Sequence, residues 1–445
     1  MKLETFKIGG VHPSGSKLSA DQPIKVMPIP DTVYIPAAQH IGKPADIIVQ
    51  KGDKVKVGQL IAKQSGFVSA NIHSSVSGTV TAIGPVPDPS GIAKNGVTIK
   101  VEGDEWMEDI DRTDTLITDV EKFSPKEIIE RVTAAGIVGM GGATFPAHVK
   151  FTVPLEKKAE ALLINGVECE PYLTADHRVM LEKSEQLMVG VKLIMRAVGT
   201  EKAFIGIEAN KPDAIEKLTE LTRKYAGIKV VPLALKYPQG SEKHLIKAIM
   251  KREVPSTKLP IDVGAVVSNA GTAVAVYEAV MKNKPLIERV VTVTGNCVKQ
   301  PSNFLARIGT PVKMLIEAAG GIPEDTGKII SGGPMMGKAA TNTDFPVAKG
   351  TSGVLLMPES LAHRGEPGPC IRCGKCVDAC PMGLEPYLLS VYSRKKMWDE
   401  AEQHYIYDCI ECGCCVFSCP ANRPLLDYMR LGKSTVMGII RSRKK

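Results

Sequence analysis

Near the end of the chain, cysteines repeat a spacing that suits iron–sulfur chemistry. Residues 370–381 and 409–420 each have the pattern C-x2-C-x2-C-x3-C-P. In two-cluster ferredoxins, three cysteines of such a run bind one [4Fe–4S] cluster, while the fourth, before the proline, binds the other cluster. The pattern therefore predicts two clusters. The ligands of the first are Cys370, Cys373, Cys376 and Cys419, and those of the second are Cys409, Cys412, Cys415 and Cys380.

Other uses of these cysteines have less support. A structural zinc site needs two C-x2-C pairs, and a disulfide framework is typical of small secreted domains, not of a chain with 445 residues. The two clusters use eight of the eleven cysteines. We expect Cys414 to be a spare thiol, because its use as a ligand would break the spacing. We expect Cys169 and Cys297 to be small buried hydrophobic residues.

The composition is that of a folded globular protein. Hydrophobic residues make up 44% and charged residues 23% of the chain, whose length suggests about three domains. The most apolar run, 263–281, contains Ser268, Asn269 and Glu278, so we expect no membrane span. The N-terminus lacks the apolar core of an export signal, and thiolate-bound clusters need a reducing compartment. We therefore expect a protein that is not exported and is either soluble or held at a membrane by partners.

The charge pattern excludes one class of partner. The net charge is +8, and aromatic residues make up only 5% of the chain, without interleaved basic and aromatic residues. Binding to nucleic acid is therefore not expected. A basic end could contact anionic lipid or an acidic protein, but a solvated, frayed terminus is the simpler expectation. This end contains Arg441, Arg443, Lys444 and Lys445.

The N-terminal region, from about residue 25 to 103, is predicted to form short strands separated by glycine turns. Segments 47–62 and 76–80 look like the two halves of a lipoyl or biotinyl carrier domain, a small barrel-sandwich. Carrier domains present a lysine at a hairpin tip, but the candidate tip, 71–75, has none. His73 in this tip could be a ligand or a proton relay. A plain surface histidine is the simpler expectation, because the histidines show no metal-ligand spacing.

From residue 124 the apolar period changes from two to 3.6. Ser124, Pro125 and Glu127 form a capping box with proline at the first helical position, which predicts a helix to about residue 135. Strands then alternate with helices, which indicates a parallel, nucleotide-binding α/β architecture with its ligand at the C-terminal edge of the sheet. The strands are expected at 161–164, 203–208 and 228–232, and the helices at 176–198, 212–225 and 241–251. A β-rich stretch is expected at 290–330, and a linker at 367–369.

A glycine-rich segment, 136–151, is the second candidate site. Consecutive glycines let backbone N–H groups approach a phosphate or a flat ring closely, and Lys150 can supply a positive charge. The segment differs from the usual dinucleotide-binding G-x-G-x-x-G, because a helix and not a strand precedes it. Taken alone, such a segment is more often only a turn.

Four segments in the same order resemble the NADH-binding flavoprotein subunit of respiratory complex I. The glycine-rich segment is similar to that family's G-x-x-G-x-G-G-x-x-F-P-x-x-x-K, and residues 165–171 are similar to N-A-D-E-x-E-P. Residues 237–242 look like Y-x-x-G-E-E, and residues 268–272 look like N-N-V-E-T. This resemblance implies a noncovalent FMN, with NAD(H) as substrate.

The same resemblance implies roles for individual residues. Glu170 and Phe145 would face the nicotinamide and are the candidate catalytic residues. Met140, Val167 and Ser241 depart from the family pattern, so the resemblance supports flavin binding more strongly than it supports the details of the dinucleotide site. The implied cofactor-binding residues are Gly139, Gly141, Gly142, Lys150, Asn165, Glu168, Glu170, Tyr237, Gly240, Glu242, Asn269 and Thr272.

The order of parts along the whole chain resembles the C subunit of the Rnf complex, a membrane-bound, ion-translocating ferredoxin:NAD oxidoreductase. The opening motif at 9–13 also fits that family. The flavoprotein subunit of complex I ends in a single cluster, so the doubled cysteine run separates the two families. The resemblance implies a barrel-sandwich domain at 1–105, a parallel α/β FMN- and NADH-binding domain at 115–255, a β-grasp (SLBB-like) domain at 256–350, a two-cluster ferredoxin-like helical domain at 360–432 and a basic tail at 433–445.

This family implies electron transfer between NAD(H) and ferredoxin through FMN and two clusters. A flavin is needed because nicotinamide exchanges electrons in pairs and a cluster exchanges them singly. The expected partners are the integral membrane subunits, which would translocate the ion, and a ferredoxin-like subunit, with ferredoxin itself an indirect partner. The chain would lie at the cytoplasmic side of the cell membrane as a peripheral subunit. Two alternatives stay open: a cobalamin reductase with the same domain set, and a non-catalytic electron-relay scaffold.

Overall fold

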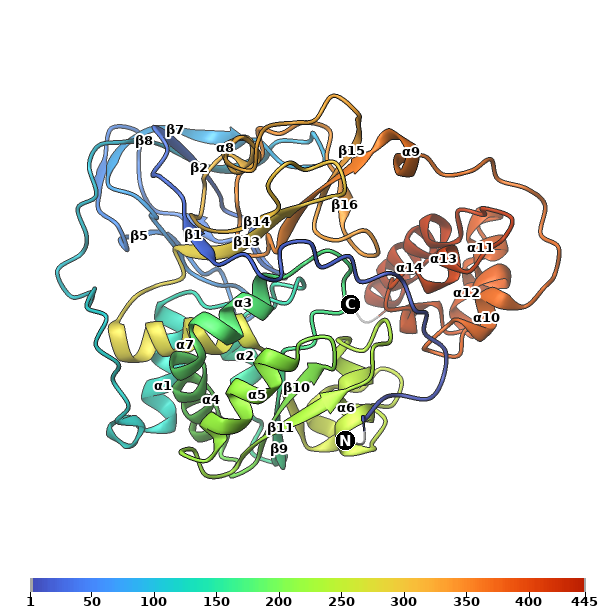
Figure 1. Ribbon diagram of the computed structural model, residues 1–445, viewed down its shortest axis with the longest axis horizontal. Helices are drawn as coiled ribbons and strands as arrows, with labels where there is room; N and C mark the ends of the chain where they lie inside the picture. The colour runs from blue at the N-terminus through green and yellow to red at the C-terminus, as the bar shows by residue number, and fades with distance from the viewer. Residues whose placement is uncertain (1–2, 444–445) are drawn as a thin grey trace.

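The structure is a computed structural model that describes residues 3–443. Two β-rich parts stand over a parallel α/β layer, and a helical module lies to one side of this larger body (Figure 1). Along the chain the order is barrel-sandwich, α/β layer, mixed sheet and helical module, which confirms the predicted fold class. In the described part of the chain, no helix is both long and apolar enough to cross a lipid bilayer.

The N-terminal part consists of two small antiparallel sheets that face each other. Valine and isoleucine side chains such as Val33, Ile61 and Ile99 fill the space between the sheets. One sheet has the order β2 (Thr32–Pro36), β8 (Lys94–Val101), β7 (Gly78–Val86) and β4 (Lys54–Val55). The other consists of β3 (Asp46–Ile47), β5 (Leu60–Lys63) and β6 (Ile72–His73).

The α/β layer contains a parallel sheet in which the strand order reverses. Its strands are β11 (Ile228–Leu233), β10 (Ala203–Glu208), β9 (Ala161–Asn165) and β12 (Ala265–Asn269), in this order. The chain runs outward from β9 to β11 and returns to the other side of β9, so Asn165 lies beside Asn269. A ligand crevice forms at the carboxyl ends of the strands at such a reversal. The helices are η1 (Val120–Lys122), α1 (Pro125–Ala134), α2 (Ala147–Phe151), α3 (Ala175–Glu182), α4 (Ser184–Val198), α5 (Pro212–Thr222), α6 (Glu242–Met250), η2 (Pro260–Val263) and α7 (Ala270–Lys282).

Helix α1 begins as its sequence predicts, whereas the next long helix is divided. The capping box is confirmed, because the Glu127 amide donates to the Ser124 hydroxyl at 3.3 Å and the Ser124 amide donates to the Glu127 carboxylate at 2.7 Å. The helix expected at 176–198 is two helices, α3 and α4. Lys183 leaves the helical conformation between them, and its Nζ lies 3.2 Å from the Glu278 carboxylate of α7.

The α/β layer extends beyond the boundary predicted at residue 255. Strand β12 pairs with β9 and α7 packs on α4, so residues 265–282 belong to this layer. The contact of the two helices needs Gly190, because a Cβ atom there would lie 1.9 Å from the Ala273 carbonyl oxygen. The prediction failed because a strand and a helix that are buried on all sides have no polar face, so the sequence has no periodicity there.

The second β-rich part is a six-stranded mixed sheet. Helix α8 (Val312–Ala318) covers it and shares a core with Phe304 and Phe345. The predicted range, 256–350, ends too early, because β17 pairs with β13 and β15, and β1 adds a strand from the N-terminal region. The strand order is β1 (Ile24–Val26), β14 (Ser302–Arg307), β13 (Glu288–Thr294), β17 (Gly353–Pro358), β15 (Thr326–Ser331) and β16 (Lys338–Ala339).

The helical module packs around one long C-terminal helix. Helix α14 contains much of the predicted tail at 433–445, where Val436 is fully buried and Arg443 lies 2.8 Å from the Glu402 carboxylate. The expectation of a frayed terminus is therefore wrong for the described residues, and Lys444 and Lys445 lie outside them. After α9 (Glu359–Ala362), the module has α10 (Lys375–Asp378), α11 (Pro386–Arg394), α12 (Trp398–Gln403), η3 (Ile406–Asp408), α13 (Cys414–Phe417) and α14 (Leu425–Ser442).

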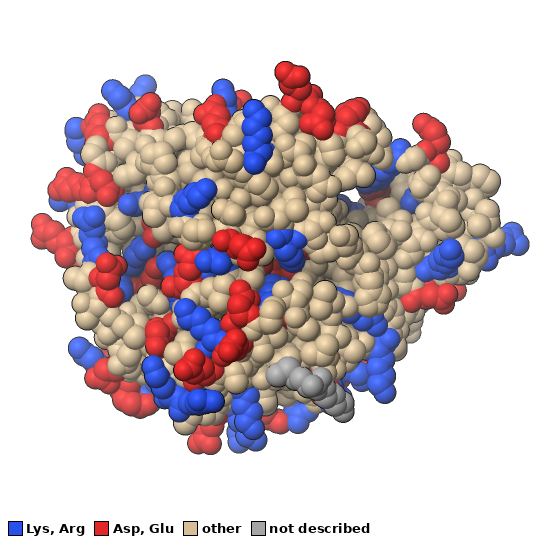
Figure 2. Space-filling model, viewed as in Figure 1, with Lys and Arg blue, Asp and Glu red and all other residues tan. Residues whose placement is uncertain are grey.

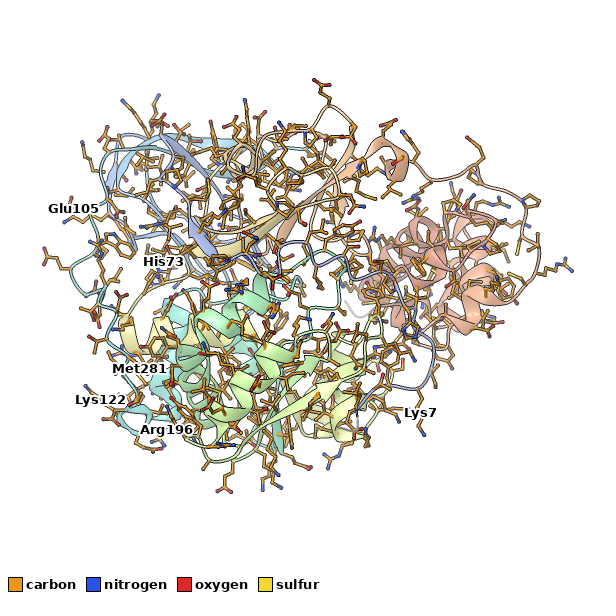
Figure 3. The ribbon with its side chains drawn as sticks, in the orientation of Figure 1. Lys7, His73, Glu105, Lys122, Arg196 and Met281 are labelled. Atoms are coloured by element: carbon orange, nitrogen blue, oxygen red, sulfur yellow. The ribbon has the colours of Figure 1, made fainter. Side chains whose placement is uncertain are left out.

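The hairpin tip predicted at 71–75 is inside the protein. His73 is 8% exposed and lies between the barrel-sandwich and the α/β layer (Figure 3). Burial lowers the pKa of His73 to about 3, so the ring is neutral near pH 7. The Ser75 hydroxyl donates to the Ile308 carbonyl oxygen of the mixed sheet. The expectation of a surface histidine is wrong because this tip is the face by which the barrel-sandwich docks.

A buried lysine connects this tip to the glycine-rich segment. Lys349 is fully buried, and its Nζ donates to the carbonyl oxygens of Asn71 at 2.6 Å and Gly136 at 2.7 Å. Burial lowers the pKa of Lys349 to about 7. Three parts of the chain therefore meet at one amine, where the glycine-rich segment begins.

The first residues form an extended arm, 4–17, between the α/β layer and the helical module (Figure 1). The Gly10 amide donates to the Ala379 carbonyl oxygen at 3.0 Å. A Cβ atom at Gly9 would lie 2.4 Å from the Cys380 carbonyl oxygen, so only glycine fits this contact. The arm thus links the beginning of the chain to a predicted cluster ligand.

We predict that Gly9→Ala loosens the arm, whereas Gly52→Ala does not. Both glycines have positive φ, 61° and 96°, but a Cβ at Gly52 would meet no atom within 4 Å. Hydrogen exchange followed by mass spectrometry should show faster exchange in residues 4–17 of Gly9→Ala alone. Equal exchange in the two variants would contradict the proposed steric contact.

Candidate functional site

A cavity of about 590 Å³ opens at the carboxyl ends of β9 and β12, where the strand order reverses. Loops of the α/β layer, the mixed sheet and the helical module form its wall. The structure brings together around it all the residues that the sequence suggested for the flavin and the nucleotide: Gly139, Gly141, Gly142, Phe145, Lys150, Asn165, Glu168, Glu170, Tyr237, Gly240, Glu242, Asn269 and Thr272.

The glycine-rich segment forms an open part of this wall. Gly142 has a φ of 110°, and a Cβ atom there would meet nothing within 4 Å, so this backbone faces empty space. The Met140 amide donates to the buried Thr272 hydroxyl at 2.8 Å, which attaches the segment to α7. An exposed glycine backbone beside a cavity accepts a flat ring or a phosphate at close range, so these residues fit FMN.

Charged side chains from two loops meet at one side of the cavity. The Lys150 Nζ lies 2.6 Å from the Glu242 carboxylate and 3.3 Å from the Val267 carbonyl oxygen. Both charged side chains are about one-third exposed, 32% and 36%. The amine is therefore held at the cavity and remains accessible to a phosphate from it.

The two asparagines at the strand ends are held by different partners. The Asn165 amide donates to the Gly240 carbonyl oxygen at 2.7 Å, and the Asn269 amide donates to the Asp176 carboxylate at 2.6 Å. Burial, followed by the charge of Glu168, raises the pKa of Asp176 to about 7. Asp176 also lines the cavity, and no motif in the sequence indicated it.

The two glutamates of the 165–171 segment have different structural roles. The Glu168 carboxylate accepts hydrogen bonds from the Asp176 amide at 2.8 Å and the His177 amide at 3.2 Å, so it stabilises the start of α3. The Glu170 carboxylate accepts from the Met335 amide at 3.1 Å and the Met336 amide at 2.7 Å. Glu170 therefore attaches a loop of the mixed sheet to the cavity.

This loop, 331–338, is a part of the site that sequence analysis missed. A Cβ atom at Gly333 would lie 2.3 Å from a Glu170 carboxylate oxygen, so glycine permits the contact. Burial raises the pKa of Glu170 to about 7, although the two amide hydrogen bonds oppose this change. The run Gly-Gly-Pro-Met-Met-Gly was the available signal, since it has three glycines within six residues.

Lys17 of the N-terminal arm binds the backbone of the segment that contains both glutamates. Its Nζ donates to the carbonyl oxygens of Glu168 at 2.8 Å, Glu170 at 2.9 Å and Leu173 at 2.6 Å. Burial lowers the pKa of Lys17 to about 8. One amine therefore replaces water for three backbone oxygens, and the sequence contained no signal for this role.

The cysteines of the helical module form two groups, here called the outer ring and the inner ring. The outer ring surrounds a cavity of about 690 Å³ and consists of Cys370, Cys373, Cys376 and Cys419. The inner ring consists of Cys409, Cys412, Cys415 and Cys380. Burial raises the pKa of the Cys415 thiol, and the nearby thiols of the other three raise it further. Each fourth cysteine thus lies with the three from the other run.

The donor set of each ring fits a cubane cluster. All the cysteines are free thiols. No group of His, Cys, Asp or Glu within the described residues is arranged around a single metal ion. A [4Fe–4S] cluster binds its four thiolates through four different irons, so its ligands stand further apart than those of one ion.

The inner ring lies next to the flavin cavity. Cys412 and Ile410 line that cavity, and the Tyr237 hydroxyl donates to the Cys412 carbonyl oxygen at 2.9 Å. The outer ring lies further out, since Cys370 and Cys373 are exposed. The inner ring, and the cluster that it would bind, therefore lies between the flavin cavity and the exposed outer ring.

The three remaining cysteines agree only in part with the prediction. Cys414 is fully buried, as suits a thiol that binds no metal. Cys297 is only partly buried and packs against the core of the mixed sheet. Cys169 is also partly buried but lines the flavin cavity, where its sulfur accepts a hydrogen bond from the Gly240 amide at 3.3 Å. The expectation of a buried hydrophobic residue is therefore incomplete for Cys169.

The fold and these sites define an iron–sulfur flavoprotein. Family models match successive parts of the chain: an RnfC barrel sandwich hybrid domain at 5–104, a Nuo51 FMN-binding domain at 132–278, an SLBB domain at 290–339 and a 4Fe-4S dicluster domain at 363–420. The cofactors of the chain are FMN and two [4Fe–4S] clusters.

Full-length relatives identify the family. The chain is 51% identical to the C subunit of the proton-translocating ferredoxin:NAD(+) oxidoreductase complex of Clostridium ljungdahlii, covering 97% of this chain and 94% of that protein. It is 46% identical to the Na(+)-translocating counterpart of Acetobacterium woodii, covering 98% of each, and 44% identical to the C subunit of the ion-translocating oxidoreductase complex of Rhodobacter capsulatus, covering 87% and 75%. The chain belongs to this family of C subunits.

A solved structure shares the fold at lower similarity. A chain of an NAD+-reducing [NiFe]-hydrogenase superposes with a TM-score of 0.50 and 19% sequence identity, covering 73% of this chain and 65% of that one.

The crossing of the fourth ligands leads to a prediction. Cys380→Ala should damage the inner cluster, although Cys380 follows the outer cysteines in sequence, because its thiol lies with Cys409, Cys412 and Cys415. Reconstituted wild-type protein should contain about eight irons and eight sulfides. In the variant, EPR should lose the signal of one cluster and retain that of the outer one, which Cys373→Ala should remove instead. Loss of the same signal in both variants would contradict the assignment.

Proposed function

We propose that this chain is the NAD(H)-interacting subunit of a membrane-bound ferredoxin:NAD(+) oxidoreductase complex. It would transfer electrons between NAD(H) and a ferredoxin-like subunit through FMN and two clusters, and integral membrane subunits would translocate the ion. The family names of the relatives support this function. The single structural observation that favours it most is the position of Cys412 in the wall of the flavin cavity.

The geometry suggests an order for the electron path. The inner cluster would exchange electrons with the flavin, because its ring borders the cavity. The outer cluster would exchange them with a partner protein, because Cys370 and Cys373 are exposed. We place the chain at the cytoplasmic side of the membrane as a peripheral subunit, where NAD(H) is available. The relatives named above are subunits of ion-translocating complexes, so a cobalamin reductase is not favoured.

The residues of the chain prepare the cavity for both ligands. FMN, when bound, supplies the exchange between electron pairs and single electrons. Gly141 and Gly142 leave room for the ring or the phosphate, and Lys150 offers its charge to the phosphate. Phe145 provides an apolar surface in the same wall. Glu170 holds the loop at 331–338 over the cavity, which would exclude water from the nicotinamide.

Lys150→Met should weaken FMN binding by about tenfold or more, because a charge-assisted hydrogen bond to a phosphate contributes roughly 1.5–3 kcal/mol. Lys157→Met is a matched control, since Lys157 also forms a salt bridge, 2.8 Å from Asp262, and its side chain is 30% exposed. Lys157 does not line the flavin cavity. Flavin content and fluorescence titration with FMN measure the effect. Equal affinity in the two variants would remove Lys150 from the flavin site.

Glu170→Gln should leave FMN and the clusters in place but slow the reduction of the flavin by NADH, through weaker positioning of the loop. The pKa of about 7 predicts a pH dependence. Above pH 7 the carboxylate is charged and accepts both amide hydrogen bonds, and below pH 7 protonation weakens them. The wild-type rate should therefore fall as the pH drops through 7.

Stopped-flow absorbance at several pH values measures these rates. Residue 170 cannot ionise in the glutamine variant, so its rate should fall less than that of the wild type over this range. Asp176, whose pKa is also about 7, lines the same cavity and accounts for the pH dependence that remains. A wild-type rate in Glu170→Gln at pH 8, with full flavin content, would exclude a role for Glu170 in the nucleotide site. The scaffold alternative would then gain support.

A further inference from the structure

The doubled cysteine run allows the surroundings of the two clusters to be compared. The residue four positions after the last cysteine is Leu384 in the first run and Arg423 in the second. Because the last cysteines cross over, Leu384 accompanies the inner ring and Arg423 the outer ring. Leu384 is buried in one apolar cluster with Cys380 and Cys409. Arg423 lines the outer cavity.

Among the described residues, 3–443, no hydrogen-bond or ion-pair partner explains the position of Arg423. Its Nε atom is buried and makes no hydrogen bond within residues 3–443. Its guanidinium also forms no ion pair with a carboxylate in this part of the chain. Buried donors almost always have an acceptor, so an unsatisfied one indicates a missing group. The outer cavity, which the four thiols surround, is where that acceptor fits.

The cations beside the inner ring are already paired. The Lys433 Nζ donates to the Cys409 carbonyl oxygen at 2.7 Å and lies 3.2 Å from the Glu411 carboxylate. Arg430 lies 3.3 Å from the same carboxylate. Glu411 forms ion pairs with both of these cations, whereas Arg423 forms none with any carboxylate within residues 3–443. The two rings thus differ in how the neighbouring cations are paired, although their cysteine spacing is the same.

We propose that Arg423 donates a hydrogen bond from Nε to a sulfur of the outer cluster and raises its reduction potential above that of the inner cluster. This inference rests on the ligand assignment made above. An N–H donor and a positive charge stabilise the reduced cluster more than the oxidised one, because reduction adds negative charge. The exposure of Cys370 and Cys373 to water acts in the same direction. A single electron would rest on the outer cluster, where a partner can exchange it.

A redox titration of the complete, reconstituted protein, followed by EPR, tests this proposal. Arg423→Leu, which copies the residue of the first run, should lower the midpoint potential of one cluster and leave the other unchanged. Arg372→Leu is the matched control, because Arg372 lines the same cavity but is exposed. It should shift the same potential less. The signal that remains in Cys380→Ala identifies the outer cluster.

Equal shifts of the midpoint potential in Arg423→Leu and Arg372→Leu would show an effect of surface charge alone and overturn the proposal. No shift in Arg423→Leu would overturn it too.

A second variant is needed if Arg423→Leu does not assemble the outer cluster. Arg423→Lys retains the charge without Nε, so it should lower the midpoint potential by a smaller amount. An unchanged potential in Arg423→Lys would also overturn the proposal. The iron content distinguishes a failure of this proposal from a failure of the ligand assignment. About eight irons with no effect of Arg423 contradicts this proposal alone, whereas about four contradicts the ligand assignment.

Discussion

The hydrogen bond from Tyr237 to Cys412 connects the wall of the flavin cavity to the inner ring, and the position of the helical module depends on it. Tyr237 is buried, so loss of its acceptor would leave an unsatisfied hydroxyl in the protein interior. Val11 of the N-terminal arm forms a β-bridge with the same tyrosine. The linker after α9 is largely exposed. The position of the module on the body therefore depends on these contacts more than on the connecting chain, which Figure 1 shows passing around the outside.

The cavity wall is made of loops, and charged side chains that are wholly or partly buried hold those loops. Backbone groups of irregular segments need partners when water is excluded. Lys17 and Lys349 supply amines to carbonyl oxygens, and Glu170 supplies a carboxylate to amides. A buried charge is costly unless hydrogen bonds satisfy it, which these backbone groups do. On the face shown in Figure 2, acidic and basic side chains are interspersed over the body.

Local patterns in the sequence predicted the parts of the site that local chemistry determines. The spacing of the cysteines indicated both rings, because a cubane constrains the residues around it. The glycine-rich segment indicated the open wall, and Ser124 indicated the start of α1. The roles of His73 and Lys17 depend on which parts pack together. No spacing within one segment carries that information, so a buried histidine was taken for a surface one.

Burial also explains why the sequence did not indicate where the α/β layer ends. Residues 265–282 are apolar on every side, and a sequence without a polar face gives no sign of the sheet it joins. Glu168 shows the same limit at the scale of one residue. Its type and position match a binding motif, but its carboxylate stabilises the start of α3. The motif thus identified a residue of the cavity wall, but it did not indicate that the carboxylate of this residue also accepts hydrogen bonds from α3.

The arm has a consequence for the order in which the chain folds. Gly10 is synthesised well before its partner, Ala379, which belongs to the helical module. Contacts between residues so distant in sequence form late, because closing a long loop has an entropic cost. The body can fold while the chain is still being made, but the arm has no complete surface until the helical module arrives. The arm is therefore among the last of the described parts to reach its final place.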